Sequence, residues 1–95
     1  MLSDRIIEGV EAEIARALRE ARRSRGLSMN RVAERAGLSP QMVSYVEREM
    51  RAPTIATFLR LCHALELDPV GILQKSTEER IQGADNMSGR LGTGS

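Results

Sequence analysis

The stretch SMNRVAERAGLSPQMVSYVE, residues 28–47, predicts two short helices joined by a tight turn. Ser28 is placed to cap the first helix, and Gly37 stands where a left-handed residue ends that helix at little cost. Ser39 then caps the second helix, with Pro40 at its first position. The apolar positions at helical spacing in these two helices are Val32, Ala33, Ala36, Val43 and Val46.

A helix, a glycine turn of about three residues and a second helix form the helix-turn-helix arrangement, whose second helix lies in the major groove of DNA. The two helices and their flanking segments resemble the lambda-repressor-like (XRE) family of helix-turn-helix DNA-binding domains. The resemblance runs from about Ile14 to Leu73, through LREARRSRGLS, RVAERAGLSPQMVSYVERE, APTIATFLRLCHAL and LDPVGIL. It implies an all-α fold, a compact lambda-repressor-like bundle of five helices.

The apolar periodicity of the rest of the chain is helical and predicts three further helices. Their expected bounds are Asp4 to Arg25, followed by Gly26; Thr54 to Leu65, after Pro53; and a short fifth helix opened by Asp68 and Pro69. The positions expected to face the core are Ile7, Val10, Ile14, Leu18 and Ala21 in the first helix, Ile55, Phe58, Leu59, Cys62 and Leu65 in the fourth, and Ile72 and Leu73 in the fifth.

We expect three segments: a helical N-terminal extension at residues 1–13, the DNA-binding domain at 14–75, and a flexible C-terminal tail at 76–95. The extension carries Ile6, Ile7 and Val10, which exceed what the family bundle requires. Two interpretations stay open for these side chains, either packing onto a partner subunit or a frayed start of the helix. The tail is rich in glycine and lacks periodicity, although its first residues, 76–80, can lengthen the fifth helix by a turn.

The formal net charge of +1 conceals an uneven distribution. Residues 1–15 carry one arginine and four acidic residues, whereas residues 16–51 carry nine arginines and four acidic residues. The positive charge therefore gathers around the helix-turn-helix, as expected for a surface that faces phosphates. A solvated helical face is the ordinary alternative for such a run of arginines.

The second helix of the motif carries the residues expected to read bases. Pro40, Gln41, Ser44 and Tyr45 point away from its apolar face, and the family resemblance implies that these positions touch base edges. Gln41 is the best candidate, because a carboxamide can both donate to and accept from an adenine edge. Ser44 is less selective, Tyr45 can reach a phosphate or a thymine methyl group, and Pro40 offers only apolar contact.

Phosphate binding is expected at helix N-termini and basic side chains around the motif. Ser28 and Ser39 mark the two N-termini, and Arg48 and Arg51 lie in the loop after the second motif helix. Arg31, on the outer side of the first motif helix, is a weaker candidate.

Three further positions follow from the resemblance. Relatives usually carry glutamine at the position of Met29, where its amide binds a phosphate, and Met29 cannot do so. Arg22 and Glu47 match positions that form a salt bridge between the first helix and the end of the recognition helix. Its implied role is to orient that helix, with Arg22 also available to a phosphate. If both charges were exposed, their pairing would contribute only ~0–1 kcal/mol.

Other functions find little support. The chain has one cysteine, Cys62, and one histidine, His63, so no internal disulfide, metal site or cofactor is expected, nor is catalysis. Aromatic platforms for single-stranded nucleic acid are lacking, since Phe58 is expected in the core and only Tyr45 remains. No stretch is long and apolar enough to span a bilayer, and no signal peptide is apparent, so a cytoplasmic location is expected.

The sequence thus predicts a transcriptional regulator that binds double-stranded DNA, as a homodimeric repressor on a palindromic operator. Dimerisation follows from energetics, because one such module reads about half a turn of DNA. The expected interface is the exposed side of the fifth helix, the N-terminal extension, or both. Two alternatives stay open: an antitoxin that also binds a toxin protein, and a protein-interaction domain of the same fold.

Overall fold

The computed structural model describes residues 2–82, and within them every regular element is helical. The elements are α1 (Asp4–Ser24), α2 (Met29–Ala36), α3 (Pro40–Glu47), α4 (Ile55–Ala64), α5 (Pro69–Thr77) and a π-helical turn, η1 (Glu78–Gln82). The predicted all-α bundle of five helices is confirmed, and the expected helix bounds agree to within about a residue. The part of the expected tail at 83–95 lies outside the described residues.

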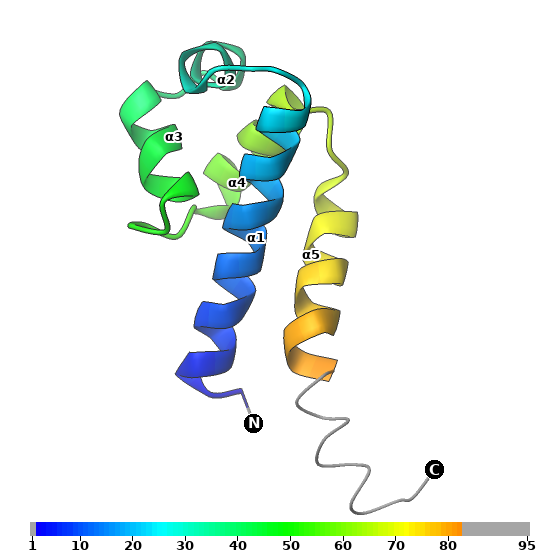
Figure 1. The fold of residues 1–95 in the computed structure, drawn as a ribbon. Coiled ribbons are helices and arrows are strands. Elements are labelled where there is room, and N and C mark those ends of the chain that lie inside the picture. The colour runs from blue at the N-terminus through cyan, green and yellow to red at the C-terminus, as the bar shows by residue number, and fades with distance from the viewer. Residues whose placement is uncertain (1, 83–95) are drawn as a thin grey trace, which may run out of the picture.

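One long helix, α1, and a second rod formed by α5 and η1 run along the bundle, and α2, α3 and α4 are short (Figure 1). α1 and α5 lie side by side and run in opposite directions, and η1 continues α5 along the first half of α1. α2 and α3 pack against each other at the far end of α1, where α4 lies under α2. The helix-turn-helix therefore sits at one end of an elongated molecule, supported by α1 and α4.

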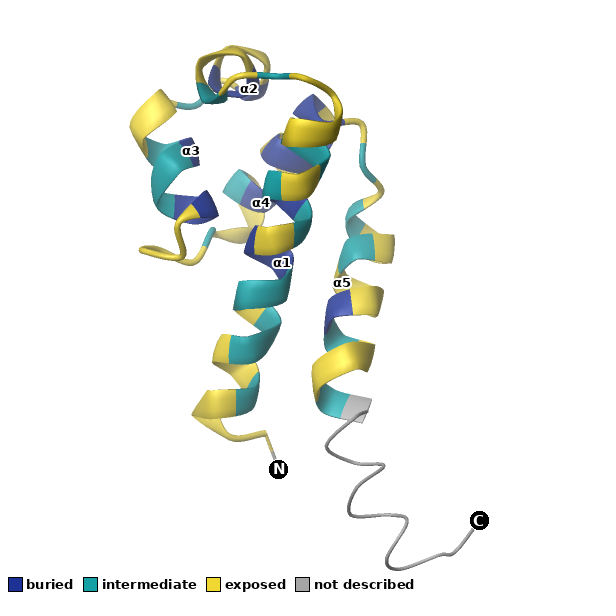
Figure 2. Cartoon of the chain, viewed as in Figure 1, coloured by how far each residue is buried: buried dark blue, intermediate teal, exposed yellow. Residues whose placement is uncertain are grey.

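The core lies where α1 to α4 meet, as Figure 2 shows by the buried residues on their inner faces. Leu18, Val32, Val43, Val46 and Leu65 are each at most 1% exposed. The other buried apolar residues of this cluster are Ile14, Ala33, Ala36, Phe58, Leu61, Cys62 and Ala64. α3 thus contributes two fully buried valines on one face, which leaves its other face to solvent.

Each α-helix begins with a polar side chain that accepts a hydrogen bond from the backbone of its own first turn. The capping residues are Ser3, Ser28, Ser39, Thr54 and Asp68. The capping of residues 28, 39, 54 and 68 was predicted, because Ser, Thr and Asp satisfy free amides at these positions. In the helix-turn-helix, Ser28 and Ser39 therefore fix where α2 and α3 begin.

The first four helices end in one recurring turn, in which an amide donates back to the carbonyl five residues earlier. These bonds run from Leu27 to Arg22, from Leu38 to Ala33, from Met50 to Tyr45 and from Leu67 to Cys62, at 2.8–3.0 Å. In each turn the preceding residue is left-handed. Gly26 and Gly37 provide this conformation at little cost, whereas Glu49 (φ 61°) and Glu66 (φ 57°) adopt it with side chains.

Some residues expected in the core are instead exposed. Ile55 is 79% exposed, Leu59 47%, Leu73 43% and Ile7 42%. The buried arc of α4 runs through Phe58, Leu61, Cys62 and Leu65, and Ile55 and Leu59 lie on its flank. The apolar surfaces of α1, α4 and α5 therefore extend beyond the part that the core covers. The prediction of burial was wrong for these four side chains.

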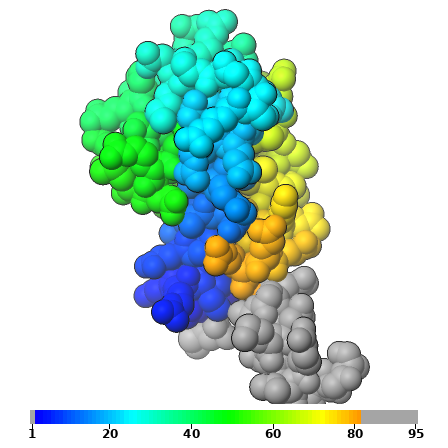
Figure 3. Space-filling view, viewed as in Figure 1, coloured from blue at the N-terminus to red at the C-terminus, as the bar shows by residue number. Residues whose placement is uncertain are grey.

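The N-terminal extension packs within the chain. Val10 is partly buried and packs against the core, whereas Ile7 stays 42% exposed. Arg80 donates to Glu13 at 2.8 Å, and a Cβ added at Gly9 would approach the Arg80 side chain to 3.2 Å. Ser76 is 4% exposed, so the chain is still packed and helical beyond the expected start of the tail. The start of α1 and the end of α5 meet at the lower end of Figure 3.

Candidate nucleic-acid interface

The turn between α2 and α3 is set by Gly37 and Ser39. Gly37 has φ 69°, and a Cβ there would lie 3.3 Å from the guanidinium of Arg60. Ser39 Oγ accepts a hydrogen bond from the amide of Met42 at 3.1 Å. Because Val43 and Val46 are buried on the opposite side, α3 presents its other face outward. A helix with one face buried and the other outward has the arrangement needed to enter the major groove of DNA.

The four predicted base-reading residues lie on or beside this outer face. Pro40 and Gln41 are exposed, and Ser44 and Tyr45 are half-buried. Gln41 Nε2 donates to the hydroxyl oxygen of Tyr45 at 2.5 Å. The structure thus brings Gln41 and Tyr45 into direct contact, an interaction that the i, i+4 spacing permits but that sequence reasoning missed.

The loop after α3 carries the two arginines predicted to contact phosphates. Arg48 and Arg51 are both exposed. The guanidinium of Arg51 lies 5.3 Å from the centre of the Tyr45 ring, within the range of a cation–π contact. Arg51 therefore lies beside the outer face of α3.

At the N-terminus of α2, the side chains of Ser28 and Arg31 bond to groups of the protein itself. Ser28 Oγ accepts a hydrogen bond from the amide of Arg31 at 3.0 Å, and the Arg31 guanidinium pairs with Glu34 at 2.6 Å. Both partners of this ion pair are largely exposed. Met29, at the position where the resemblance implies a phosphate-binding glutamine, packs against the core. The departure from the family pattern at Met29 therefore adds apolar contact to α2.

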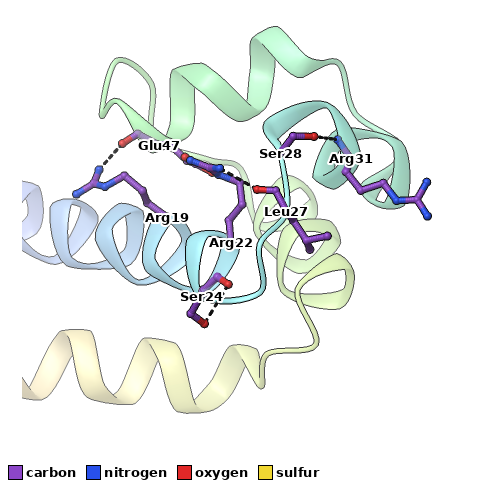
Figure 4. Close-up of polar contacts among 8 residues, drawn as sticks. Arg19, Arg22, Ser24, Leu27, Ser28, Arg31 and Glu47 are labelled. Carbon is purple, nitrogen blue, oxygen red and sulfur yellow. Dashed lines mark hydrogen bonds and ion pairs between the residues drawn. The ribbon is translucent and has the colours of Figure 1, made fainter.

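An ion pair joins α1 to the end of α3 (Figure 4). Arg22 Nε donates to Glu47 Oε2 at 2.7 Å, and the side chains are 12% and 4% exposed. A second nitrogen of Arg22 donates to the carbonyl of Leu27 at 2.9 Å. The alternative of two exposed charges is thus wrong for Arg22 and Glu47, because both are withdrawn from solvent.

Arg19 adds a contact that the sequence analysis did not anticipate. Its guanidinium donates to the backbone carbonyl of Glu47 at 2.7 Å. Figure 4 shows Arg19 and Arg22 reaching from one face of α1 to the same residue of α3. Their i, i+3 spacing on α1 was the available signal, since residues at this spacing share a helix face.

Residues 2–82 offer few groups that could bind a metal ion, react as a nucleophile or cross a membrane. No three metal-ligating side chains gather there, and no helix in that range has an apolar run long enough to cross a membrane. Burial raises the pKa of the Cys62 thiol to about 11. His63, on the same helix, is exposed, as expected.

Comparison with known proteins agrees with this geometry. The helix-turn-helix family model matches residues 18–72, which is more than half of the chain. The chain belongs to the XRE-type helix-turn-helix family. This is a family of DNA-binding transcription regulators, and the matched range contains the whole motif and its support on α1 and α4.

Two curated relatives fall in the same class. The HTH-type transcriptional regulator SutR of Escherichia coli is 31% identical over 61 residues, 64% of this chain and 34% of SutR. The uncharacterized HTH-type transcriptional regulator y4dJ of Sinorhizobium fredii is 37% identical over 57 residues, 60% of this chain and 74% of y4dJ. The chain thus spans about a third of the length of SutR.

Two solved structures share the fold. A point mutant of the restriction-modification controller protein C.Esp1396I superposes with a TM-score of 0.67 at 19% identity, covering 77% of this chain and 95% of that one. The clp gene regulator ClgR of Corynebacterium glutamicum gives 0.66 at 24% identity, covering 86% and 88%. At these identities the likeness concerns the fold alone.

Proposed function

We propose that this protein is a sequence-specific regulator of transcription that binds double-stranded DNA through α3. The observation that carries the proposal is the outward polar face at the start of α3, with Gln41 exposed and Ser44 half-buried, opposite two fully buried valines. A helix end of this shape fits the major groove, where a carboxamide can discriminate adenine by ~1–3 kcal/mol.

The charge of the chain supports duplex DNA as the partner. Residues 16–51 hold nine of the fourteen basic residues, and Arg48 and Arg51 are exposed in the loop beside α3. Free amides at the starts of α2 and α3, beyond those capped by Ser28 and Ser39, add weaker sites for phosphate oxygens. Arg31 is shared with Glu34, which leaves it the weakest of these candidates.

Two arginines of α1 bind the last residue of α3, as a helix that must keep a fixed orientation toward DNA would need. Arg22 and Arg19 hold the side chain and the carbonyl of Glu47, the last residue of α3. A rotation of α3 would leave the charges of Arg22 and Glu47 unpaired, so these contacts favour one orientation of the helix. We assign Arg22 and Glu47 the role of orienting the recognition helix.

A homodimer on a palindromic operator is part of the proposal. The apolar groove between α4 and α5, about 320 Å³, is flanked by side chains that the core leaves uncovered. They are Ile55, Leu59, Val70 and Leu73, exposed by 43–79%. We propose this uncovered apolar surface as the dimer interface, because a symmetric dimer is what half-sites ~34 Å apart require.

The regulatory outcome proposed is repression by blocking access to a promoter. The relatives' names place them among transcriptional regulators, which supports regulation in general for this chain. Repression, rather than activation, is tested by placing a reporter behind a promoter that overlaps the selected operator. A fall in expression when the protein is supplied supports repression, and a rise contradicts it.

The first experiment is selection from a randomised duplex library, followed by titration of selected and scrambled sites at several salt concentrations. An enriched inverted repeat that keeps its advantage at physiological salt supports an operator-binding dimer. Binding without a motif that disappears as salt rises indicates phosphate attraction alone and contradicts the proposal. Stable co-purification of a toxin-like protein with the chain would then favour the antitoxin alternative.

The dimer has its own test, by sedimentation in the absence of DNA. Ile55→Glu places a charge in the proposed interface and is expected to convert dimers to monomers. His63→Glu is the matched control, because His63 is exposed on the same helix but outside the groove. A variant Ile55→Glu that sediments as a dimer contradicts this interface.

A further inference from the structure

Tyr45 lies between the residue proposed to read bases and the residue proposed to hold a phosphate. Its hydroxyl oxygen accepts a hydrogen bond from Gln41 at 2.5 Å, and its ring lies beneath the guanidinium of Arg51. The side chain is half-buried on the outer side of α3. Both polar and aromatic parts of Tyr45 are therefore engaged by neighbouring residues.

The contact with Tyr45 uses only one of the hydrogen-bonding groups of the Gln41 carboxamide. One N–H of Gln41 is held by the Tyr45 hydroxyl, so the second N–H and the carbonyl oxygen are free to point outward. A bidentate contact with adenine uses one donor and one acceptor. Holding the flexible glutamine side chain before DNA arrives reduces the conformational entropy lost on binding.

The turn after α3 brings Arg51 back over the same ring. The amide of Met50 donates to the carbonyl of Tyr45 at 2.9 Å, and Glu49 is left-handed. The chain thus reverses within three residues of Glu47, and Arg51 lies beside the reading face. The position of the Arg51 guanidinium over the Tyr45 ring depends on this reversal of the chain.

From these contacts we propose that Tyr45 is a positioning residue that orients Gln41 for base reading and Arg51 for a phosphate. This differs from the expected direct contact of Tyr45 with DNA, since it assigns the hydroxyl oxygen and the ring to contacts within the protein. The Gln41 contact does not use the hydroxyl hydrogen, so direct donation to DNA is the alternative that the test must separate. The proposal rests on the proposed function, in which α3 reads a specific site.

The test measures two quantities on the selected operator: preference for the base read by Gln41, and the slope of affinity against salt. Tyr45→Phe keeps the ring and removes the hydroxyl, so base preference should fall by about two- to tenfold, the range for one neutral hydrogen bond, with the salt slope unchanged. Tyr45→Leu removes both contacts, and the salt slope should also weaken, by up to about one phosphate contact.

A double-mutant cycle separates positioning from direct contact. In the Gln41→Ala background, Tyr45→Phe should cause no further loss of base preference, because the residue it orients is absent. An equal loss in both backgrounds would mean that Tyr45 touches DNA itself and would overturn the proposal, as would an unchanged preference in Tyr45→Phe alone. Wild-type protein without any salt-resistant preference would instead refute the proposed function on which this inference depends.

Discussion

Removing the carboxylate of Glu47 should destabilise the fold far more than removing any exposed acidic side chain. Glu47→Ala leaves the Arg22 guanidinium in a site that is 12% exposed, with only the Leu27 carbonyl as a remaining partner. Loss of one member of a buried ion pair costs about 3–5 kcal/mol. Because Arg22 keeps that carbonyl and some solvent contact, we expect the lower end, about 3 kcal/mol.

The size of this effect makes it easy to measure. Native domains are stable by roughly 5–15 kcal/mol, so the variant should remain folded but unfold at much lower urea concentration. For a domain of this size, a loss of about 3 kcal/mol lowers the Tm by roughly 12–24 °C. Circular dichroism during urea and thermal unfolding follows the loss of helix directly.

Two comparison variants sharpen the test. Glu34→Ala removes the carboxylate of the exposed pair with Arg31, and its effect should stay within ~0.5 kcal/mol. Glu47→Gln keeps the volume and an acceptor oxygen, so its cost should fall between the other two. If Glu47→Ala and Glu34→Ala unfold at the same urea concentration, the reasoning from burial of this pair is refuted.

Three further predictions follow from single residues. Gln41→Ala should relax preference at one base pair, whereas Arg51→Ala should weaken binding to all sequences and lower the salt slope by about one; equal effects on operator and random DNA contradict the role of Gln41. Glu66→Gly should raise the unfolding free energy by about 0.5–1 kcal/mol by relieving a left-handed residue, and Gly37→Ala should lower it, as urea unfolding will show. With its pKa raised to about 11, Cys62 is a neutral thiol near neutral pH, so a thiol reagent should react only as the protein unfolds; fast reaction in native buffer contradicts its burial.

Much of the fold was predictable because its signals are local. Ser28, Gly37, Ser39 and Pro40 each act on backbone within four residues of themselves, so their positions mark where helices begin and end. Glu49 and Glu66 show the limit of this reasoning. They occupy the same left-handed position as a glycine, and nothing in their residue type announces it.

The sequence predicted which residues belong to the candidate site, but it did not predict how their side chains contact one another. Gln41, Tyr45 and Arg51 were each named as DNA contacts, yet their mutual contacts, which make Tyr45 a bridge between them, came from the structure. The direction of the Arg51 side chain depends on the reversal after α3, which spans several residues and has no sequence signature. The roles of these residues toward DNA stay predictions for the experiments above.

The sequence alone was enough to predict the helices, the turn between α2 and α3, and the family, since helical periodicity and capping are short-range properties of the chain. Only the tertiary structure decided which side of each apolar helix is covered. Ile55 and Leu73 have the same apolar character as Phe58, but the core reaches one flank of α4 and leaves the other open. Burial of Arg22 and Glu47 depends in the same way on α1 and α3, brought together across 25 residues of chain.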